Sequence, residues 1–343
     1  MFNPRYSISP KLLENIKRIA ALTSELNNRA FPKLITLEME RSARALSAYS
    51  STSIEGNPLP LTEVKKLLKH SPKNLRDTEK EVLNYNATLE YLDRITKSKK
   101  LDISLSFILT VQKMVTEGLI ENHRSGKIRN EPVFVNDPRT RRTVYLPPET
   151  SDVPALLDEL IGFALANEGV LDPLIIAGIF HKQFVIIHPF VDGNGRTARL
   201  TSKSLLASMG LDTFNLFSFE NYYNKNVSNY FQKVGLFGNY YELKEVVDFT
   251  EWLEYFTDGI IDELLRVKKE LEKSSLAVEP RINIESSVVI DYLNKHGSIN
   301  EMEYSTISKR AKSTRALDFR KMVDQGIIDR FGKGRNTFYR LKK

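Results

Sequence analysis

The spacing of apolar residues over residues 1–275 most constrains the fold, because it repeats with the period of an α-helix. In residues 10–27, for example, Leu12, Ile16 and Ile19 fall on one helical face. Similar patterns predict further helices at residues 35–49, 61–69, 78–95, 104–119, 153–167, 171–187, 194–209, 222–236 and 243–271. We therefore expect a mainly α protein.

Residues 131–146 break the helical pattern and predict a β-hairpin. Two short runs rich in β-branched and aromatic residues flank a polar turn at residues 136–138, and Pro147 and Pro148 end the second run. A lone hairpin is marginally stable in water, so this one should pack on the helical body. The strand residues of interest are Val133, Phe134, Val135, Val144 and Tyr145.

A polar segment at residues 273–281 predicts a linker, and the pattern changes beyond it. Three short helices are expected at residues 287–295, 300–309 and 314–324, followed by strands at residues 327–330 and 336–341. Three helices and a basic hairpin are the layout of a small winged helix-turn-helix domain, which we place at residues 281–343.

The charge of the chain is concentrated in this last segment. The formal net charge is +7, and residues 281–343 alone hold 14 Lys and Arg against 7 Asp and Glu, whereas residues 1–280 are balanced. Such asymmetry favours a separate module that binds nucleic acid. The expected contacts are Lys312, Arg315, Arg320 and Lys321 on the third helix, with Lys333 and Arg335 on the hairpin. A solvated basic face, or a surface that binds protein, is the alternative.

Composition excludes several other classes. The chain has no cysteine, which rules out a disulfide scaffold, a thiolate metal site and a cysteine nucleophile. No apolar run approaches the roughly 18 residues of a membrane span, and residues 1–10 lack the pattern of a signal peptide. We expect a cytoplasmic protein without a membrane partner.

The segment from His188 to Arg199 is the most informative for function. Gly193, Asn194 and Gly195 follow an apolar helix and open the next one, where free backbone N–H groups and the helix dipole favour an anion. Arg196 and Arg199, three residues apart, share a helical face and suit phosphate. Asp192 is suited to a Mg²⁺ ion beside phosphates, and His188 to accepting a proton.

Each of these residues also has an ordinary structural explanation. A Gly-x-Gly is usually a turn, an aspartate near a helix start is usually a cap, and a histidine before proline is usually structural. Their grouping within twelve residues between two helices favours a phosphate site.

This segment resembles the signature of the Fic family, His-Pro-Phe-x-(Asp/Glu)-Gly-Asn-Gly-Arg-x-x-Arg, at every specified position. The resemblance extends over roughly residues 35–260. It implies a helical Fic core at residues 101–272, an N-terminal helical region at residues 1–100, and transfer of AMP from ATP to a hydroxyl side chain of a target protein.

The resemblance also implies roles for the individual residues. His188 would deprotonate the target Tyr, Ser or Thr, and Asp192 would hold Mg²⁺ between the α- and β-phosphates. Arg199 would bind the γ-phosphate. The α- and β-phosphates would be held by the Gly193–Gly195 backbone, Asn194 and Arg196, and Phe190 would anchor the loop. Adenine should lie under later residues, for which Tyr223, Asn226 and Tyr230 are candidates.

The hairpin resembles the family's flap, which would pair with the target backbone as an added strand. Relatives of the Doc type carry Lys at the position of Gly195 and act as kinases, so Gly195 favours nucleotidyl transfer here. A minority branch that transfers phosphocholine is not excluded.

Ser51, Glu55 and Gly56 resemble the family's inhibitory motif, (Ser/Thr)-x-x-x-Glu-(Gly/Asn). We expect Glu55 to pair with Arg199, occupy the place of the γ-phosphate and leave bound ATP unproductive. Support of the reverse reaction, AMP removal, is a further role open to Glu55. The alternative is a helix that merely ends near Gly56.

Two functions of different class follow. One is a self-inhibited protein adenylyltransferase that modifies an unidentified target protein, or itself. The other is an ATP-sensing, DNA-binding transcription regulator built on a Fic core. An intact His188 and Asp192 favour the enzyme, because a sensor needs neither. Pairing of two copies of the chain through the core helices is left open.

Overall fold

The computed structural model describes most of the chain, namely residues 2–28, 33–98, 103–136, 142–208, 216–277, 284–324 and 327–342. Two compact units emerge, one formed by residues 1–30 and 39–268 and the other by residues 31–38 and 269–343. Residues on both sides of the boundary expected at residue 100 belong to the first unit.

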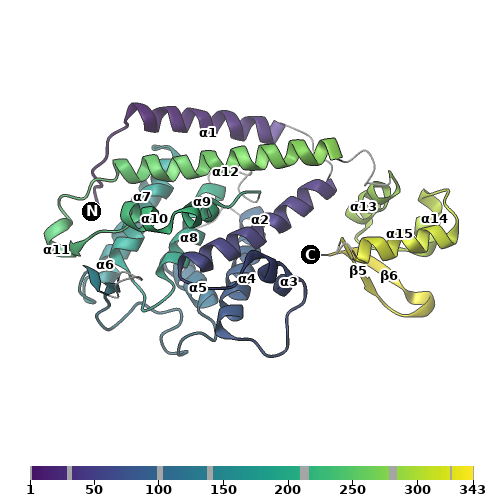
Figure 1. Cartoon of the computed structure of the whole chain (residues 1–343), viewed down its shortest axis with the longest axis horizontal. Coiled ribbons are helices and arrows are strands. Elements are labelled where there is room, and N and C mark those ends of the chain that lie inside the picture. The colour runs from purple at the N-terminus through teal and green to yellow at the C-terminus, as the bar shows by residue number, and fades with distance from the viewer. Residues whose placement is uncertain are drawn as a thin grey trace. The chain divides into compact units, whose positions relative to one another are not determined.

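Helices make up nearly all of the first unit (Figure 1). Those lying wholly or mostly within it are α1 (Pro10–Asn28), α2 (Lys33–Ile54), α3 (Leu61–Lys69), α4 (Asp77–Ser98), α5 (Leu105–Val115), α6 (Val153–Ala166), α7 (Pro173–Ile187), α8 (Asn194–Ser208), α9 (Phe219–Lys225), α10 (Val227–Val234), α11 (Tyr240–Leu243) and α12 (Thr250–Ala277). The mainly α fold is confirmed.

Helix α7 lies at the centre of the first unit. Thirteen of its fifteen residues are buried, and it packs against α6, α8 and α10. Trp252 of α12 donates an Nε1 hydrogen bond of 2.7 Å to the Gly178 carbonyl, and a Cβ at Gly178 would lie 2.6 Å from Leu253 Cδ2. The close approach of α12 therefore requires glycine in α7, and it fixes the helix that leads into the His188 loop.

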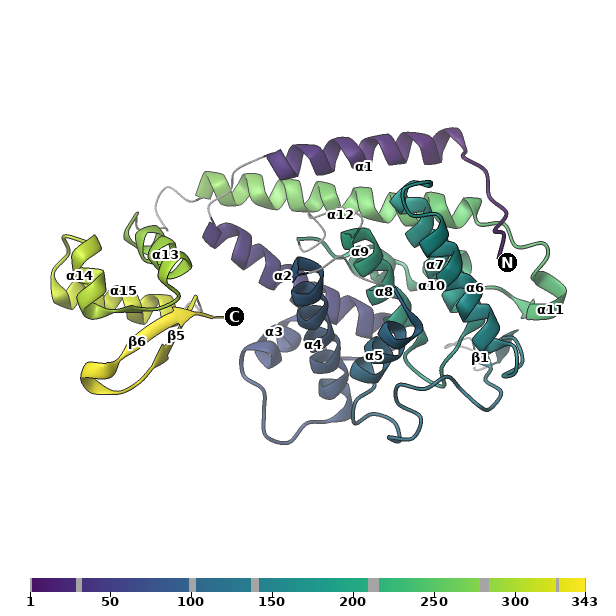
Figure 2. The same ribbon diagram turned by 180° about the vertical axis from the view of Figure 1, so that it is seen from behind.

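Helix α1 runs beside α12 (Figures 1 and 2). The Asn15 amide donates to Thr257 Oγ1 at 3.0 Å and to Asp258 Oδ1 at 2.8 Å, and Lys268 pairs with Glu25 at 2.7 Å. Apolar packing, hydrogen bonds and an ion pair thus join α1 to α12, which are some 240 residues apart in the sequence.

Several helix boundaries differ from the predicted ones: α2 continues beyond residue 49 to Ile54, and α5 already ends at Val115. The helix predicted at residues 222–236 is two helices, because the extended Asn226 (φ −146°) ends α9 and caps α10 by accepting from Asn229 N. The helix predicted at residues 243–271 begins only at Thr250, whose N–H is capped by Asp248. It continues to Ala277, into the predicted linker, the rest of which lies outside the described residues.

The predicted hairpin is confirmed as strands β1 (Val135–Asn136) and β2 (Thr143–Leu146), which pair antiparallel. Its turn lies outside the described residues. A third strand that the sequence did not predict, β3 (Gly238–Asn239), runs parallel to β2 and leaves β1 at an edge of the sheet. The hairpin therefore packs on the helical body as expected.

The second unit contains the three predicted helices and two predicted strands, together with one additional strand. Its core is an apolar cluster around Leu293, Phe319 and Ile328. The sheet is antiparallel in the order β4-β6-β5. The elements are α13 (Ile284–His296), β4 (Ile299–Asn300), α14 (Glu301–Ile307), α15 (Lys312–Asp324), β5 (Ile328–Phe331) and β6 (Phe338–Leu341). Among the helices of the described residues, none has the length and apolar character needed to cross a membrane.

Candidate active site

The His188 loop connects the end of α7 to the start of α8. His188 ends α7 in the left-handed conformation (φ 51°, ψ 59°), with its N–H bonded to the Phe184 carbonyl at 3.0 Å. Pro189 follows, and proline cannot continue the helical hydrogen bonds. The fully buried Phe190 packs near Phe184, with 6.0 Å between ring centroids. The loop is therefore anchored in the core on the side where the histidine leaves the helix.

Two residues of the glycine segment shape the loop itself. The Asn194 side chain accepts from Phe190 N at 2.9 Å and donates to the Phe190 carbonyl at 2.8 Å. Gly193 has φ +79°, and a Cβ there would lie 2.9 Å from Thr116 Cγ2. The Asn194 side-chain amide thus closes the loop and is not available to a phosphate. Only the backbone N–H of Asn194 could bind a phosphate, because N–H groups in the first turn of a helix have no intrahelical partner.

Two buried side chains from other elements hold the loop, and the sequence pattern revealed neither. Gln112 of α5 donates to the Asp192 carbonyl at 3.1 Å and accepts from Gly126 N at 2.5 Å. Arg129 donates through Nε to the His188 carbonyl at 2.8 Å and through Nη2 to the Pro148 carbonyl at 2.5 Å. Arg129 thereby ties the His188 loop to the base of the hairpin.

The surroundings of His188 set the state of its imidazole. Nδ1 lies 3.2 Å from the Val185 carbonyl oxygen, which can only accept, so we assign the proton to Nδ1 and the lone pair to Nε2. Burial lowers the pKa of His188 below its usual value, opposed by the Val185 carbonyl and the charge of Glu55. The imidazole is therefore neutral at pH 7 with an acceptor nitrogen available, as a general base requires.

Arg196 lies buried between two carboxylates. Its guanidinium contacts Glu81 of α4 at 2.9 Å and Asp192 at 2.9 Å. Glu81 also accepts from the Asn57 amide at 2.7 Å, so the segment after α2 is joined to the loop. Sequence reasoning missed Glu81, because one glutamate in an amphipathic helix carries no signal of its own.

Asp192 is the residue of the loop best suited to a metal ion. Its side chain is 47% exposed, and Mg²⁺ in nucleotide sites commonly takes one or two carboxylates together with phosphate oxygens. Within the described residues, no group of three or more His, Asp or Glu side chains converges on a metal position. The half-exposed Asp192 carboxylate, which also pairs with Arg196, could serve as one ligand of such an ion.

Arg199 is fully buried and forms the ion pair expected with the N-terminal motif. Its Nη2 lies 2.7 Å from Glu55 Oε1. Its Nε donates to Ser51 Oγ at 2.7 Å, its Nη2 also donates to the Ser51 carbonyl at 3.1 Å, and its Nη1 donates to the Tyr230 hydroxyl at 3.4 Å. Every nitrogen of this guanidinium is thus directed at a protein oxygen.

The end of α2 presents Glu55 to this arginine. Helix α2 stops at Ile54, and Gly56 follows in the left-handed conformation (φ +95°), so the helix end near Gly56 and the ion pair of Glu55 occur together. A Cβ on Gly195 would overlap Glu55 Oε1. Glycine at this position thus admits the Glu55 carboxylate as well as leaving room for a phosphate.

A buried carboxylate fixes α2 against the core. Glu220 is fully buried and accepts from Tyr85 OH at 2.9 Å, Ser47 Oγ at 3.2 Å and Ser218 Oγ at 2.9 Å. Ser47 lies one turn before Ser51 on α2. Glu220 thus positions the helix that leads to Glu55, and no sequence pattern singled it out.

The residues expected to hold adenine have other surroundings. Tyr223 has no exposed surface and stacks on Tyr230, with 4.6 Å between ring centroids. Tyr230 reaches the site only through the hydroxyl that meets Arg199, and Asn226 is an exposed helix cap. In this conformation Tyr223 cannot touch a base, because the aromatic core encloses it.

The hairpin presents one buried and one exposed face. Tyr145 is 3% exposed and donates to the Ile186 carbonyl, one residue before the end of α7, at 2.9 Å. Phe134 is 60% exposed, whereas Val133, Val135 and Val144 are half-buried. Tyr145 therefore anchors the hairpin, while β1 and the Phe134 side chain remain accessible at its edge.

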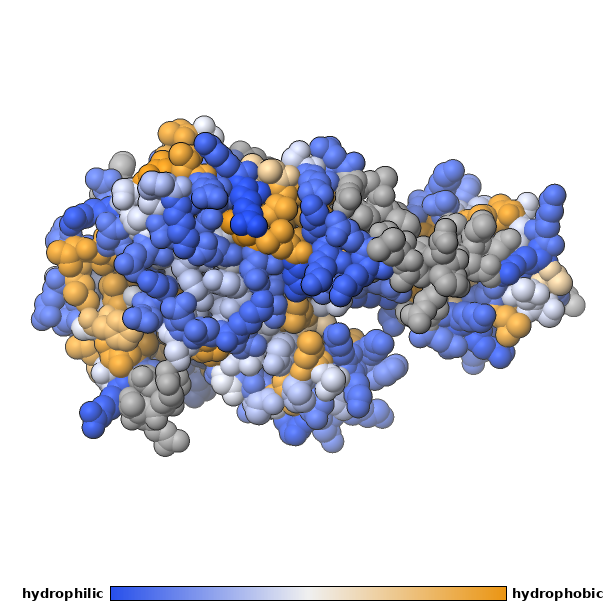
Figure 3. Space-filling model, turned by 45° about the horizontal axis from the view of Figure 1, so that its top comes forward, coloured by the Kyte–Doolittle hydropathy of each residue, from blue (hydrophilic) through white to orange (hydrophobic). Residues whose placement is uncertain are grey.

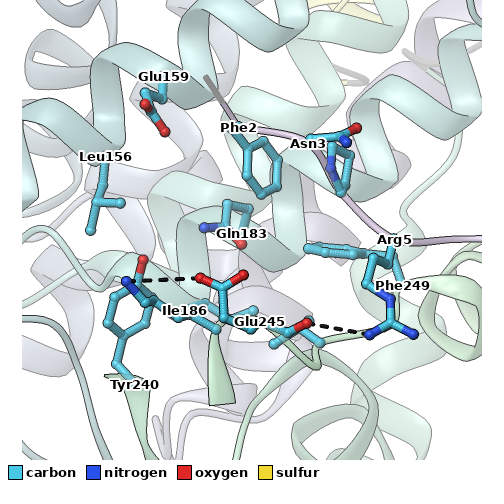
Figure 4. A pocket seen from close by; sticks show the side chains of 13 residues that line it. Phe2, Asn3, Arg5, Leu156, Glu159, Gln183, Ile186, Tyr240, Glu245 and Phe249 are labelled. Carbon is cyan, nitrogen blue, oxygen red and sulfur yellow. Dashed lines mark hydrogen bonds and ion pairs between the residues drawn. The ribbon is translucent and has the colours of Figure 1, made fainter. Parts of the chain in front are cut away.

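A separate cavity is lined by residues 2–5, by residues of α6 and α7 and by part of residues 240–249, and its lining includes no residue of the His188 loop. Figure 4 shows the side chains of Phe2, Gln183 and Glu245 around it. Its lining includes Ile186 and Tyr240, which also pack against Tyr145 beneath the hairpin.

The geometry can be compared with known proteins. Residues 102–206 match the model of the Fic/DOC family. A protein adenylyltransferase Fic of Culex quinquefasciatus is 27% identical over 228 residues, covering 61% of this chain and 43% of that protein. One of Nematostella vectensis is 29% identical over 166 residues, covering 47% of this chain and 37% of that protein. The chain thus spans less than half the length of these curated relatives.

Solved structures share the fold. A Fic family protein from Desulfovibrio desulfuricans G20 superposes with a TM-score of 0.66 at 19% identity, covering 99% of this chain and 98% of that one. A Fic-domain signaling protein from Bacteroides thetaiotaomicron gives 0.62 at 21% identity, covering 76% and 97%. The family model thus identifies a Fic/DOC domain within residues 102–206, and the solved structures share the fold of this chain.

Proposed function

We propose that the chain is a protein adenylyltransferase that transfers AMP from ATP to a Tyr, Ser or Thr hydroxyl of a target protein, possible targets including the chain itself. The observation that carries this proposal is the position of the buried His188 imidazole, at the end of α7 and in one loop with a helix N-terminus and two arginines. Relatives named protein adenylyltransferase Fic support the same chemistry.

The proposed step follows from these positions. The target hydroxyl oxygen forms a bond to the α-phosphorus of ATP, the bond from that phosphorus to the pyrophosphate oxygen breaks, and the hydroxyl proton passes to His188 Nε2. The N–H groups at the start of α8 and Arg196 stabilise negative charge on the α- and β-phosphates. When bound with ATP, Mg²⁺ at Asp192 would neutralise phosphate charge.

The hairpin supplies the orientation of the target. Strand β1 lies at the edge of its sheet, so an extended target segment can add as a further strand. Arg129 joins the hairpin base to the His188 carbonyl. A hydroxyl presented along β1 is therefore held in a fixed position relative to the base.

We further propose that Glu55 inhibits this activity. Arg199 is the arginine assigned to the γ-phosphate, and Glu55 contacts it at 2.7 Å. A γ-phosphate and the Glu55 carboxylate carry like charges and compete for one guanidinium. ATP in the wild-type chain would bind without the Arg199 contact that aligns its α-phosphorus, so the resting enzyme is slow.

The test is transfer of label from ATP carrying it at the α-phosphate, with the Glu55→Gly variant and the double variant Glu55→Gly/His188→Ala. We expect covalent label on the chain or on lysate protein with Glu55→Gly, and none with the double variant. ATP labelled at the γ-phosphate serves as the control, because a kinase would transfer only that label. Tight ATP binding without covalent label in any variant would refute the enzyme and favour an ATP sensor.

A further inference from the structure

The second unit contributes no residue to the proposed AMP transfer, so the role of its surface is a separate matter. Its elements follow in the order helix, strand, helix, helix, strand, strand, with a sheet ordered β4-β6-β5. This is the layout of a winged helix-turn-helix, in which the helix corresponding to α15 lies in the major groove of DNA and the final hairpin lies beside it. In this layout, the exposed faces of α15 and of the β5–β6 hairpin are the surfaces that would face DNA.

Two of the arginines near α15 are structural. Arg310 Nη1 contacts both oxygens of the buried Asp318 at 2.8 Å, and Asp318 also accepts from Tyr304 OH at 2.9 Å. Arg315, expected from the sequence to contact DNA, instead pairs with Glu301 at 2.5 Å and is only 11% exposed. Removing either charge would leave its partner carboxylate stranded, so these arginines hold the unit together.

The remaining cations are exposed. Exposed Lys and Arg side chains on α15, on the β5–β6 hairpin or a few residues before α15 include Lys309, Lys312, Arg320, Lys321, Arg330 and Lys333. The side chain of Arg335 lies outside the described residues. Figure 3 shows a mostly hydrophilic surface on the visible, coloured atoms of this unit.

The exposed residues of α15 form one face. At 100° per residue, Ser313, Arg320 and the acidic Asp324 lie near its middle. Lys312 and Lys321 lie at its two borders, and Leu317 lies between the middle and the Lys321 border. Leu317 is an apolar residue, yet it is 51% exposed and so is not needed to fill the core. A groove-binding helix has this arrangement, with lysines at the borders for the two phosphate backbones and residues in the middle for base edges and thymine methyls.

The β5–β6 hairpin adds a stiff, basic edge. Phe331 and Phe338 stack with 5.5 Å between ring centroids, and the Arg340 guanidinium lies 5.2 Å from the centre of Phe338. Lys333 is exposed at the turn that follows Phe331. The aromatic pair stiffens the hairpin. The hairpin in turn holds Lys333 where it could contact a phosphate of the DNA backbone.

We propose that the second unit binds double-stranded DNA, with α15 in the major groove and the β5–β6 hairpin on the adjacent backbone. The acidic Asp324 lies at the last position of α15, so the groove contact is assigned to the part of the helix from Lys312 to Lys321. This activity is independent of the proposed transferase chemistry, because it uses no residue of the His188 loop.

The test measures fluorescence anisotropy of a labelled duplex titrated with the full chain over a range of salt concentrations. The variant carries Lys312→Glu, Arg320→Glu and Lys321→Glu. The matched control carries Lys17→Glu, Lys65→Glu and Lys73→Glu, which reverse three exposed charges of the first unit and so change the net charge equally. Circular dichroism shows whether both variants are folded.

We expect the wild type and the control to bind alike, with affinity that falls steeply with salt. The α15 variant should bind at least about tenfold more weakly at low salt, and its log–log salt slope should be smaller by about two to three. Absence of duplex binding by the wild type at low salt, equal losses in both variants, or tighter binding to duplex RNA than to DNA would each overturn the proposal.

Discussion

The Glu55→Gly substitution should activate the enzyme, and the structure sets the size of the effect. The Glu55–Arg199 contact is 2.7 Å long, with Arg199 fully buried and the Glu55 side chain 30% exposed. Breaking a fully buried pair costs about 3–5 kcal/mol. Partial exposure of Glu55 and the Ser51 bonds that Arg199 keeps lower this, so we take the pair as worth about 2–3 kcal/mol.

That free energy gives the expected change in rate. If the active arrangement requires Glu55 to leave Arg199, a bias of about 2–3 kcal/mol leaves the wild-type chain active only about 0.7–3% of the time. Removing the carboxylate should therefore raise the transfer rate at saturating ATP by about 30- to 150-fold. Glu55→Gln, which keeps the shape of the side chain but not its charge, should give an intermediate rate.

Two measurements check this reasoning. Initial rates of AMP incorporation from α-labelled ATP should follow the order wild type, Glu55→Gln, Glu55→Gly. Thermal unfolding should show that Glu55→Gly is less stable without nucleotide, and that ATP raises its melting temperature more than that of the wild type, since the γ-phosphate then takes the place beside Arg199. Equal rates for wild type and Glu55→Gly would refute the inhibitory role of Glu55.

Three further predictions concern residues that position the site. In the Glu55→Gly background, the pH profile of kcat/KM should stay flat at pH 7 and fall only below the usual pKa of histidine. The reason is that burial lowers the pKa of His188 and the loss of Glu55 removes an influence that raises it; a fall centred above pH 7 would contradict the assigned neutral base. Arg129→Ala should lower kcat by about tenfold or more, because the His188 carbonyl and the hairpin base lose a shared donor; kcat partly restored by Arg129→Lys would support positioning, while unchanged kcat would exclude it. Glu220→Gln should cost about 1–2 kcal/mol of unfolding free energy and partly activate the wild-type chain, because α2 loses acceptor capacity at Ser47 and Tyr85; loss of stability without a gain in transfer rate would show that Glu220 does not act through α2.

Much of the helical framework follows from local pattern. Helix α3 has the predicted bounds, Leu61–Lys69, because its apolar stripe lies wholly within nine residues that directly follow Pro60. The split at Asn226 was missed because a capping asparagine inside an apolar period looks like an ordinary helical residue until its backbone is seen to be extended. Strand β3 was missed because two residues make no period.

The candidate site likewise has a part that the sequence reveals and a part that it does not. The His188 loop is contiguous, so its histidine, glycines and arginines are visible together in the sequence. The residues that support this loop are not visible in this way, because Gln112, Glu81 and Arg129 come from other parts of the chain. In the sequence, a buried polar residue that bonds to a distant group cannot be told from a surface residue.

What the sequence by itself determined is the position of a candidate anion site, because its glycines and arginines fall within twelve neighbouring residues whose spacing places them at one helix start. It also placed the excess charge in residues 281–343. Only the tertiary structure decided how these elements are held. It brings Glu55 against Arg199 across 144 residues, through a gap that Gly195 leaves open. It also ties Arg310 and Arg315 to carboxylates while leaving Lys312, Arg320 and Lys321 exposed. The physical reason is that pairing and burial depend on which surfaces meet in space, and residue spacing along the chain does not specify those meetings.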